Sequence, residues 1–282
     1  MVTLQERVKL VRSESERLKE YLTGLPSDAW SQASACDAWQ VGDVVGHLTW
    51  AAEGFADSIS RGVGGDASAR APFDFSPGTA KASSLAEHIA LCAIAHREAL
   101  GDRLLAAFIT SSDRLNQVFD ELGPQDWDKQ CGFLSGSRTP ETFLLGRLPE
   151  LAIHDWDIRS RFEPLAALSN DSLPALMERV PNFVGWSFHP GPSLSEPLRY
   201  RFELTGPGST GKDVVVQGDA CRLEPAGDGP IIGPFRCDTS TFVLLMCGRL
   251  AAGAAFSEGR LAVEAGRGLV DEFAGWFGGN QN

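Results

Sequence analysis

Apolar residues recur every three or four positions through four long stretches of the first 165 residues, which predicts amphipathic helices. The predicted helices span residues 3–25, 40–60, 84–122 and 139–161. The third is either straight or bent near Gly101. Thr139 followed by Pro140 is typical of a helix start, because the threonine hydroxyl caps the first turn and proline lacks only an N–H that needs no partner there.

Beyond residue 165 the pattern changes from helical spacing to alternation. Leu198, Tyr200, Phe202 and Leu204 are separated by single polar residues, as in a half-buried strand, and residues 214–216 form a hairpin partner after a glycine-rich turn. Further strands are predicted at 220–224, 234–237 and 260–264, and helices at 170–180, 239–250 and 268–277. Strands that follow a run of helices indicate a separate α+β domain.

Length and composition fit two domains of an ordinary globular protein, which we expect at residues 1–165 and 166–282. The net charge of −12 repels phosphate backbones and anionic lipid, so neither nucleic acid nor a membrane is an expected partner. The first residues are polar and helix-forming rather than basic and then apolar, and no run of eighteen apolar residues occurs. The sequence therefore predicts a cytoplasmic protein.

The candidate chemistry lies in the second and fourth predicted helices. Glu150 and His154 are one turn apart on the same helix face, so a carboxylate oxygen and an imidazole nitrogen can reach one ion. His47 shares an apolar stripe with Val44 and Leu48 and should point inward. A buried glutamate is costly unless it is paired or bound to a metal, which favours joint metal binding over a solvated pair or a core histidine.

The six cysteines are scattered and show no Cys-x-x-Cys spacing, which argues against a zinc knuckle, a redox pair or a disulfide framework. We expect structural roles for most of them. The role of Cys36 is left open, because this cysteine lies just before the segment that carries His47.

Two motifs carry a resemblance to a known family. They are Trp39-x3-Asp43-Val44-x2-His47-Leu48 and Arg147-x2-Glu150-x3-His154-x-Trp156-Asp157. Together they resemble the DinB-like family of mycothiol-dependent maleylpyruvate isomerases, over nearly the whole chain. Two positions depart from the family pattern: Ala38 stands where relatives often have glycine, and Pro149 directly precedes the glutamate.

The resemblance implies an α+β protein in two domains, an up-down four-helix bundle followed by a smaller mixed α/β domain. It implies a divalent metal, usually zinc, bound by His47, Glu150 and His154. Three protein ligands leave a position for a low-molecular-weight thiol such as mycothiol, which a metal converts to the nucleophilic thiolate. The expected activity is then a thiol-dependent isomerisation or thiol S-transfer on a small molecule.

Two further residues of the second motif are candidate catalytic groups. Arg147, one turn before Glu150, is expected to pair with that carboxylate or to bind an anion. Asp157 is expected to orient the imidazole of His154. Pro149 predicts a kink just before the glutamate.

Other functions remain open from the residues themselves. The same ligands suit a hydrolase that uses metal-bound water, or a non-catalytic metal or small-molecule binding protein. They also suit iron, nickel or cobalt in place of zinc. A monomer and a homodimer are both compatible with the sequence.

Overall fold

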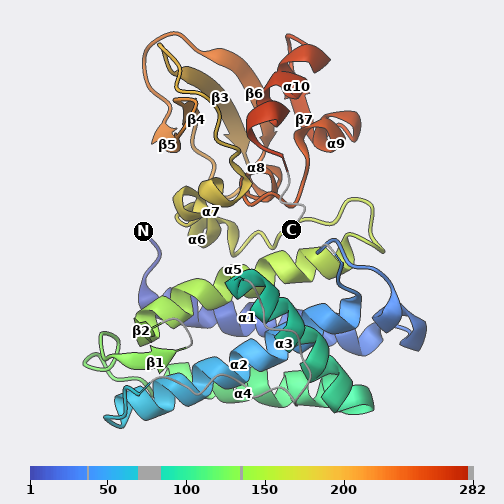
Figure 1. The fold of residues 1–282 in the computed structure, drawn as a ribbon, viewed down its shortest axis with the longest axis vertical. Coiled ribbons are helices and arrows are strands. Elements are labelled where there is room, and N and C mark those ends of the chain that lie inside the picture. The colour runs from blue at the N-terminus through green and yellow to red at the C-terminus, as the bar shows by residue number, and fades with distance from the viewer. Residues whose placement is uncertain (37, 69–83, 134–135, 279–282) are drawn as a thin grey trace. The chain divides into compact units, whose positions relative to one another are not determined.

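The computed structural model describes residues 1–36, 38–68, 84–133 and 136–278 (Figure 1). Contacts between residues divide the chain into two compact units. One comprises Thr3–Pro164, and the other comprises Leu165–Asn282 together with Met1–Val2. We call them the helical unit and the sheet unit and describe each by itself.

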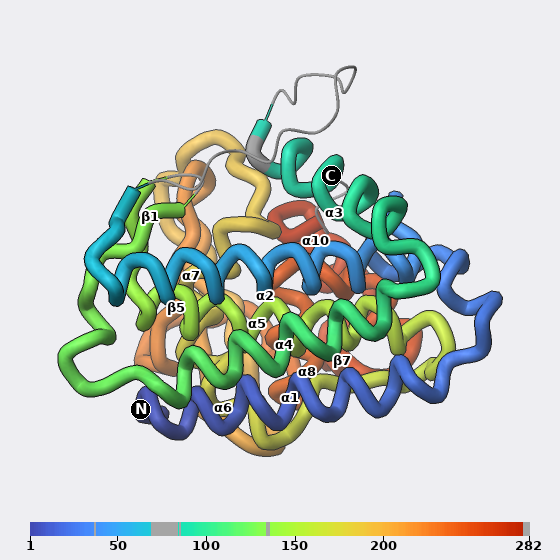
Figure 2. Tube along the Cα trace, turned by 90° about the horizontal axis from the view of Figure 1, so that it is seen from below, coloured from blue at the N-terminus to red at the C-terminus, as the bar shows by residue number. Residues whose placement is uncertain are grey.

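The helical unit contains a bundle of long antiparallel and crossing helices with a short hairpin. Its elements are α1 (Leu4–Gly24), η1 (Ser27–Ser31), α2 (Val41–Val63), α3 (Leu85–Leu100), η2 (Gly101–Arg103), α4 (Leu104–Glu121), β1 (Cys131–Phe133), β2 (Gly136–Arg138) and α5 (Pro140–Arg159). α2 packs against α3, α4 and α5, while α1 packs against α4 and α5. Figure 2 shows α1, α4 and α2 lying side by side. The helical bundle predicted from the sequence is confirmed.

The segment predicted as one helix from 84 to 122 is two helices. The chain turns at Gly101, whose backbone has φ 52° and ψ −129°, a conformation that glycine tolerates and other residues rarely adopt. A second difference is the antiparallel pair of β1 and β2, which lies between two predicted helices where no strand was predicted. Neither strand shows alternation long enough to be recognised.

Local sequence explains where the helices begin and how closely two of them approach. The Thr139 hydroxyl accepts a hydrogen bond from the Thr142 N–H, with Pro140 in the first turn, as predicted. α2 and α3 meet at Gly46, where an added Cβ would lie 2.6 Å from the carbonyl oxygen of Ala93. Only glycine leaves room for this contact.

The sheet unit is a five-stranded mixed sheet covered by helices. Its elements are α6 (Leu173–Met177), α7 (Val180–Ser187), β3 (Leu198–Thr205), β4 (Lys212–Val216), β5 (Cys221–Pro225), β6 (Ile232–Asp238), α8 (Thr239–Met246), α9 (Ala252–Ser257), β7 (Leu261–Val263) and α10 (Arg267–Trp276). The strand order is β5-β4-β3-β6-β7, in which only the β3–β6 pair is parallel. The predicted α+β class is confirmed.

The core of the sheet unit is aromatic. Phe202 on β3 contacts the rings of Phe235, Phe242 and Phe273 at centroid distances of 5.0 to 5.4 Å. Tyr200 packs beside them. The alternation read from the sequence therefore placed the two buried rings of β3 on the correct face. Among the described residues, no helix is both long enough and apolar enough to cross a membrane.

Candidate metal centre

The structure brings together the three predicted metal ligands. His47 comes from α2, and Glu150 and His154 come from α5, which packs against it. One donor atom from each side chain lies within 4.8 Å of the other two. The one-turn spacing on α5 places the carboxylate and the imidazole on a common face, and the contact between helices supplies the third donor.

Hydrogen bonds define which atoms face the cluster. His47 Nε2 lies 2.8 Å from Glu150 Oε2. His154 Nδ1 lies 2.8 Å from Asp157 Oδ2, which leaves Nε2 as the nitrogen available to the cluster. The two imidazole rings meet edge to face, with centroids 5.0 Å apart. The Trp39 ring lies 5.4 Å from His47 and 6.2 Å from His154, so it covers both imidazoles.

Burial and charge hold these side chains in forms that can bind a cation. The side chain of Glu150 is 32% exposed, whereas His47 and His154 are buried. Burial alone would raise the pKa of Glu150, but the nearby His47, His154 and Arg147 hold that pKa at about 2. Burial lowers the pKa of His154 despite the opposing effect of Asp157. Near neutral pH the carboxylate is therefore charged and the His154 imidazole is neutral, as metal ligands must be.

A separate set of contacts fixes the start of α2, one turn before His47. The Asp43 carboxylate accepts a hydrogen bond from the Gln40 N–H at 3.1 Å and another from Arg97 Nε at 2.7 Å. The first bond closes the N-terminal turn of α2, and the second ties it to α3. His47 thus sits on a helix end that is held from two directions.

The opposite side of α5 is fixed by buried charge. Asp155, adjacent to His154, is 1% exposed and lies 3.1 Å from Arg17 of α1 and 3.4 Å from Arg159. Arg17 also pairs with Glu14 of α1. A buried carboxylate paired in this way resists rotation of α5, because any turn of the helix would leave the charges unpaired.

Arg147 lies in the interior of the bundle, close enough to Glu150 for the two charges to interact. Its side chain is 1% exposed, and Nη1 donates to the carbonyl oxygen of Leu48 at 3.2 Å. Its other terminal nitrogen, Nη2, is buried without a hydrogen-bond partner among the described residues. Burial lowers the pKa of Arg147 to about 10, partly offset by Glu150, so the guanidinium stays charged at neutral pH. It braces α5 against the residue that follows His47.

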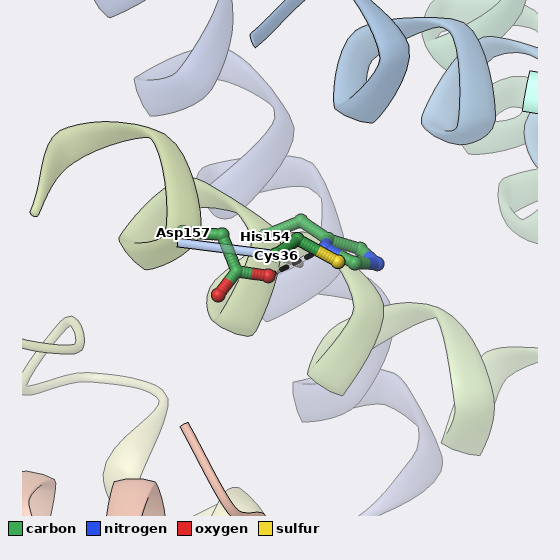
Figure 3. Close-up of side chains that lie close together, drawn as sticks. All are labelled: Cys36, His154 and Asp157. Atoms are coloured by element: carbon green, nitrogen blue, oxygen red, sulfur yellow. Dashed lines mark hydrogen bonds and ion pairs between the residues drawn. The ribbon is translucent and has the colours of Figure 1, made fainter. Parts of the chain in front are cut away.

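Asp157 is fully buried and contacts the imidazole that it was expected to orient. The carbonyl of the same residue accepts a hydrogen bond from the Ala35 N–H at 2.8 Å. This bond brings the connection before α2 next to α5. Cys36 follows directly, and its sulfur forms a second cluster with His154 and Asp157, again within 4.8 Å (Figure 3). The role of Cys36 was left open from the sequence, and its contact with His154 and Asp157 could not be predicted because it depends on the path of the connection.

The same connection contains Ala38, one of the two departures from the family pattern. Ala38 has φ 58°, in the left-handed region that favours glycine. The turn it makes allows the Trp39 N–H to donate to the Cys36 carbonyl at 3.1 Å. A glycine at this position would adopt the same turn without strain. The other departure, Pro149, lies inside α5 without ending it.

The donor atoms of His47, Glu150 and His154 suit a divalent cation of intermediate softness. Two nitrogens and one carboxylate oxygen are the ligands of many catalytic zinc sites. A tetrahedral ion with bonds of about 2.0 to 2.2 Å holds its ligand atoms about 3.3 to 3.6 Å apart. The side chains would therefore move by no more than about 1.5 Å to close on an ion of this kind.

A second histidine–carboxylate pair in the same unit has no third donor beside it among the described residues. His96 Nε2 on α3 lies 3.4 Å from Glu53 Oε2 on α2. Within the described part of the chain, no third metal-binding side chain joins this pair. It provides a matched comparison for the cluster around His154.

Comparison with known proteins gives a family and a fold. The family model described as the mycothiol maleylpyruvate isomerase N-terminal domain matches residues 11–159, which include all three candidate ligands. Two solved structures are similar: the mycothiol-dependent maleylpyruvate isomerase and a histidine-to-alanine variant of it. Each has a TM-score of 0.60 and 16% identity, and each match covers 94% of both chains. No curated protein sequence matches.

Proposed function

Because the chain belongs to the mycothiol maleylpyruvate isomerase family, we propose that it is a thiol-dependent isomerase whose metal is held by His47, Glu150 and His154. The observation that carries the proposal is the convergence of these three donor atoms from two helices. A divalent ion held there would favour the ionised, nucleophilic form of a low-molecular-weight thiol. Zinc is the preferred ion because of the donor set.

The charges around the cluster support an anionic partner. Glu150 and Arg147 carry opposite charges that cancel, and Asp157 contributes one further carboxylate. A divalent cation would leave this buried group with one net positive charge. A thiol that binds as its anion brings the sum to zero, whereas a neutral thiol does not.

In this proposal the residues of the chain bind and orient the reacting groups. Asp157 fixes the ring of His154 through Nδ1, and the Trp39 ring packs beside both imidazoles. Between Arg147 and Arg159 there is no serine or cysteine that could act as a nucleophile. The proposal therefore assigns that role to the external thiol.

The proposed reaction is cis–trans isomerisation of an activated alkene. The thiolate sulfur adds to one alkene carbon, and the electron pair of the double bond moves onto the conjugated carbonyl. The remaining single bond rotates, and the electrons return as the carbon–sulfur bond breaks. The thiol is regenerated, so no group is transferred and no oxidant is needed. Transfer of the thiol with loss of a leaving group would instead consume it.

The donor atoms and their partners all lie within the helical unit, and the division between the two units falls between Pro164 and Leu165. We propose on this basis that residues 1–165 form the metal-binding domain and residues 166–282 a separate domain. A cytoplasmic location fits a thiol-dependent enzyme, because thiols stay reduced there.

The test combines metal content with thiol binding. Protein purified without added metal should contain about one equivalent of a divalent ion, and His47→Ala should lose it while the matched variant His96→Ala keeps it. Cobalt-substituted protein titrated with mycothiol, bacillithiol, glutathione and cysteine should develop a sulfur-to-metal charge-transfer band with one of them. Isomerisation of a maleyl-type substrate should require that thiol. Hydrolysis of esters or amides without any thiol binding would replace this proposal with a hydrolase.

A further inference from the structure

His154 belongs to two groups of donor atoms, one on each side of its ring. The first group contains His47 and Glu150, and the second contains Cys36 and Asp157. We propose that Cys36, His154 and Asp157 form a second cation site, selective for a thiophilic ion such as Cd²⁺, Cu⁺ or excess Zn²⁺. Occupation of this site opposes metal binding at the first.

The donor set of the second group differs in kind from that of the first. It offers a sulfur, a nitrogen and a carboxylate oxygen, all within 4.8 Å of one another. Figure 3 shows the thiol and the carboxylate directed toward the imidazole. Thiolate ligands select soft cations, whereas two imidazoles and a carboxylate suit borderline ones. The two groups should therefore prefer different metals.

The site is held in place and remains reachable. The Cys36 N–H donates to Ser34 Oγ at 3.1 Å, and Ser34 Oγ donates in turn to the Cys36 carbonyl at 3.1 Å. The Ala35–Asp157 main-chain bond fixes the same segment on α5. Asp157 is fully buried, but Cys36 is only partly buried and is not in a disulfide. An ion can approach from the Cys36 side and find its ligands largely arranged.

Competition follows from the proton on His154. Nδ1 now hydrogen-bonds Asp157, with Nε2 available to the first group. A cation on Nδ1 takes the lone pair there, so the ring proton must move to Nε2 or leave. In the first case Nε2 can no longer bind the other ion. In the second the ring becomes an imidazolate, which demands loss of a further proton. Each metal therefore weakens the other by the same factor.

The existence of the second site is independent of the proposed function, whereas the competition rests on the proposed metal at His47, Glu150 and His154. A different variant tests each of these two claims. Cys36→Ala removes sulfur from the second group and leaves every ligand of the first. His47→Ala removes a ligand of the first group and leaves the second complete.

The first experiment titrates Cd²⁺ into metal-free, full-length protein and follows the ultraviolet sulfur-to-cadmium charge-transfer absorption. Wild type and His47→Ala should both show a band that saturates at one equivalent, and Cys36→Ala should lack it. Cys36→Ser, which keeps the size of the side chain, should lack it too. Cys221→Ala is the matched control, because Cys221 is also partly buried but belongs to neither group, and it should keep the band.

The outcomes separate the two claims. A band that survives in Cys36→Ala, or one that disappears in His47→Ala, would overturn the second site. Absence of stoichiometric zinc in wild type, with the cadmium band intact, would overturn the proposed function alone.

The second experiment measures competition. Loading wild type with one equivalent of Zn²⁺ should raise the Cd²⁺ concentration at half-maximal absorption by at least about tenfold. The same Zn²⁺ should have no effect in His47→Ala. Equal cadmium affinities with and without zinc in wild type would show that the two groups do not compete.

Discussion

The two units bury different kinds of side chain. Inside the helical unit lie charged and imidazole groups: Arg7, Glu14, Lys19, Asp43, His47, Asp126, Arg147, His154, Asp155 and Asp157. The sheet unit buries mainly aromatic rings and small hydroxyls, and Asp213 is its one buried charged residue among those described. Burying charge costs free energy, whereas burying rings contributes it. Burial of side chains therefore stabilises the helical unit less than the sheet unit, and the charged groups that cause this difference include those of the candidate metal centre.

The two units also differ in the hydrogen-bond partners of their buried polar atoms. Asp213 is paired with Arg199 at 3.0 Å and with Arg201, and it accepts a further bond from the Gly227 N–H. In the helical unit, His47 Nδ1 and Arg147 Nη2 are buried without a hydrogen-bond partner in the described structure. Asp213 therefore has a partner for each of its oxygens, whereas these two nitrogens of the helical unit do not have one.

The largest effect expected is from His154→Ala, which removes the imidazole shared by both donor groups. Metal affinity should fall by more than about 100-fold, and thiol-dependent turnover should fall with it. Metal analysis after dialysis against a weak chelator measures the first, and the isomerase assay the second. Unchanged metal content would remove the proposed function from this cluster.

Phe202→Ala should lower the free energy of unfolding and leave metal affinity unchanged. Phe202 is fully buried among the rings of the sheet unit, so its loss should cost about 3 to 5 kcal/mol of unfolding free energy. Urea denaturation measures the loss. Zinc affinity of the native protein should stay within about twofold of wild type. A large drop in metal affinity would mean that the two units are not functionally separable.

Asp157→Asn should have an intermediate effect. It keeps the shape of the side chain but removes the charge that holds His154 Nδ1, so metal affinity should fall by about 10- to 100-fold. Asp213→Asn is the control from the sheet unit, and it should lower the unfolding temperature without changing metal affinity. Equal metal affinities for wild type and Asp157→Asn would assign Asp157 a purely structural role.

A smaller effect is expected from acid. In the metal-free protein the pKa of Glu150 is held at about 2, below its ordinary value of 4.5. The carboxylate therefore contributes stability that is complete above about pH 4.5 and is lost as the pH falls towards about 2. Glu150→Gln should show a shallower decline of unfolding free energy with falling pH over this interval. Parallel curves for the two proteins would show that the histidines and Arg147 do not stabilise the charge.

Ala38→Gly should have the smallest effect. It relieves a left-handed backbone conformation but adds freedom to the unfolded chain, so the net gain should be no more than about 1 kcal/mol. The melting temperature should rise slightly, with the charge-transfer band of the Cys36 site unchanged. A fall in melting temperature would mean that the turn is not strained.

The sequence predicted what depends on spacing along a helix. Glu150 and His154 could be placed on one face because helical geometry fixes i and i+4, and His47 could be turned inward because its neighbours Val44 and Leu48 are apolar. A bend near Gly101 was one of two possibilities, and the sequence could not decide between them because the apolar pattern continues from Leu100 to Leu104 across it.

What depends on an irregular path was not predictable. Cys36 reaches His154 only because the chain turns at Ala38 and pairs with α5 through Ala35. Arg147 was expected to pair with Glu150 or to bind an anion, and its hydrogen bond to the carbonyl of Leu48 on another helix was not foreseen. Contacts of this kind are set by tertiary packing, and no local pattern in the sequence encodes them.

The packing of α2 on α5 also determines when the donor atoms can first meet during synthesis. His47 precedes Glu150 by 103 residues. At a translation rate of about 5 to 20 residues per second, its imidazole waits about 5 to 20 s for its partners. Through that time the nascent chain carries α2 without the helix that completes the ligand set. A metal bound by the proposed ligand set could therefore be captured only after α5 has emerged from the ribosome.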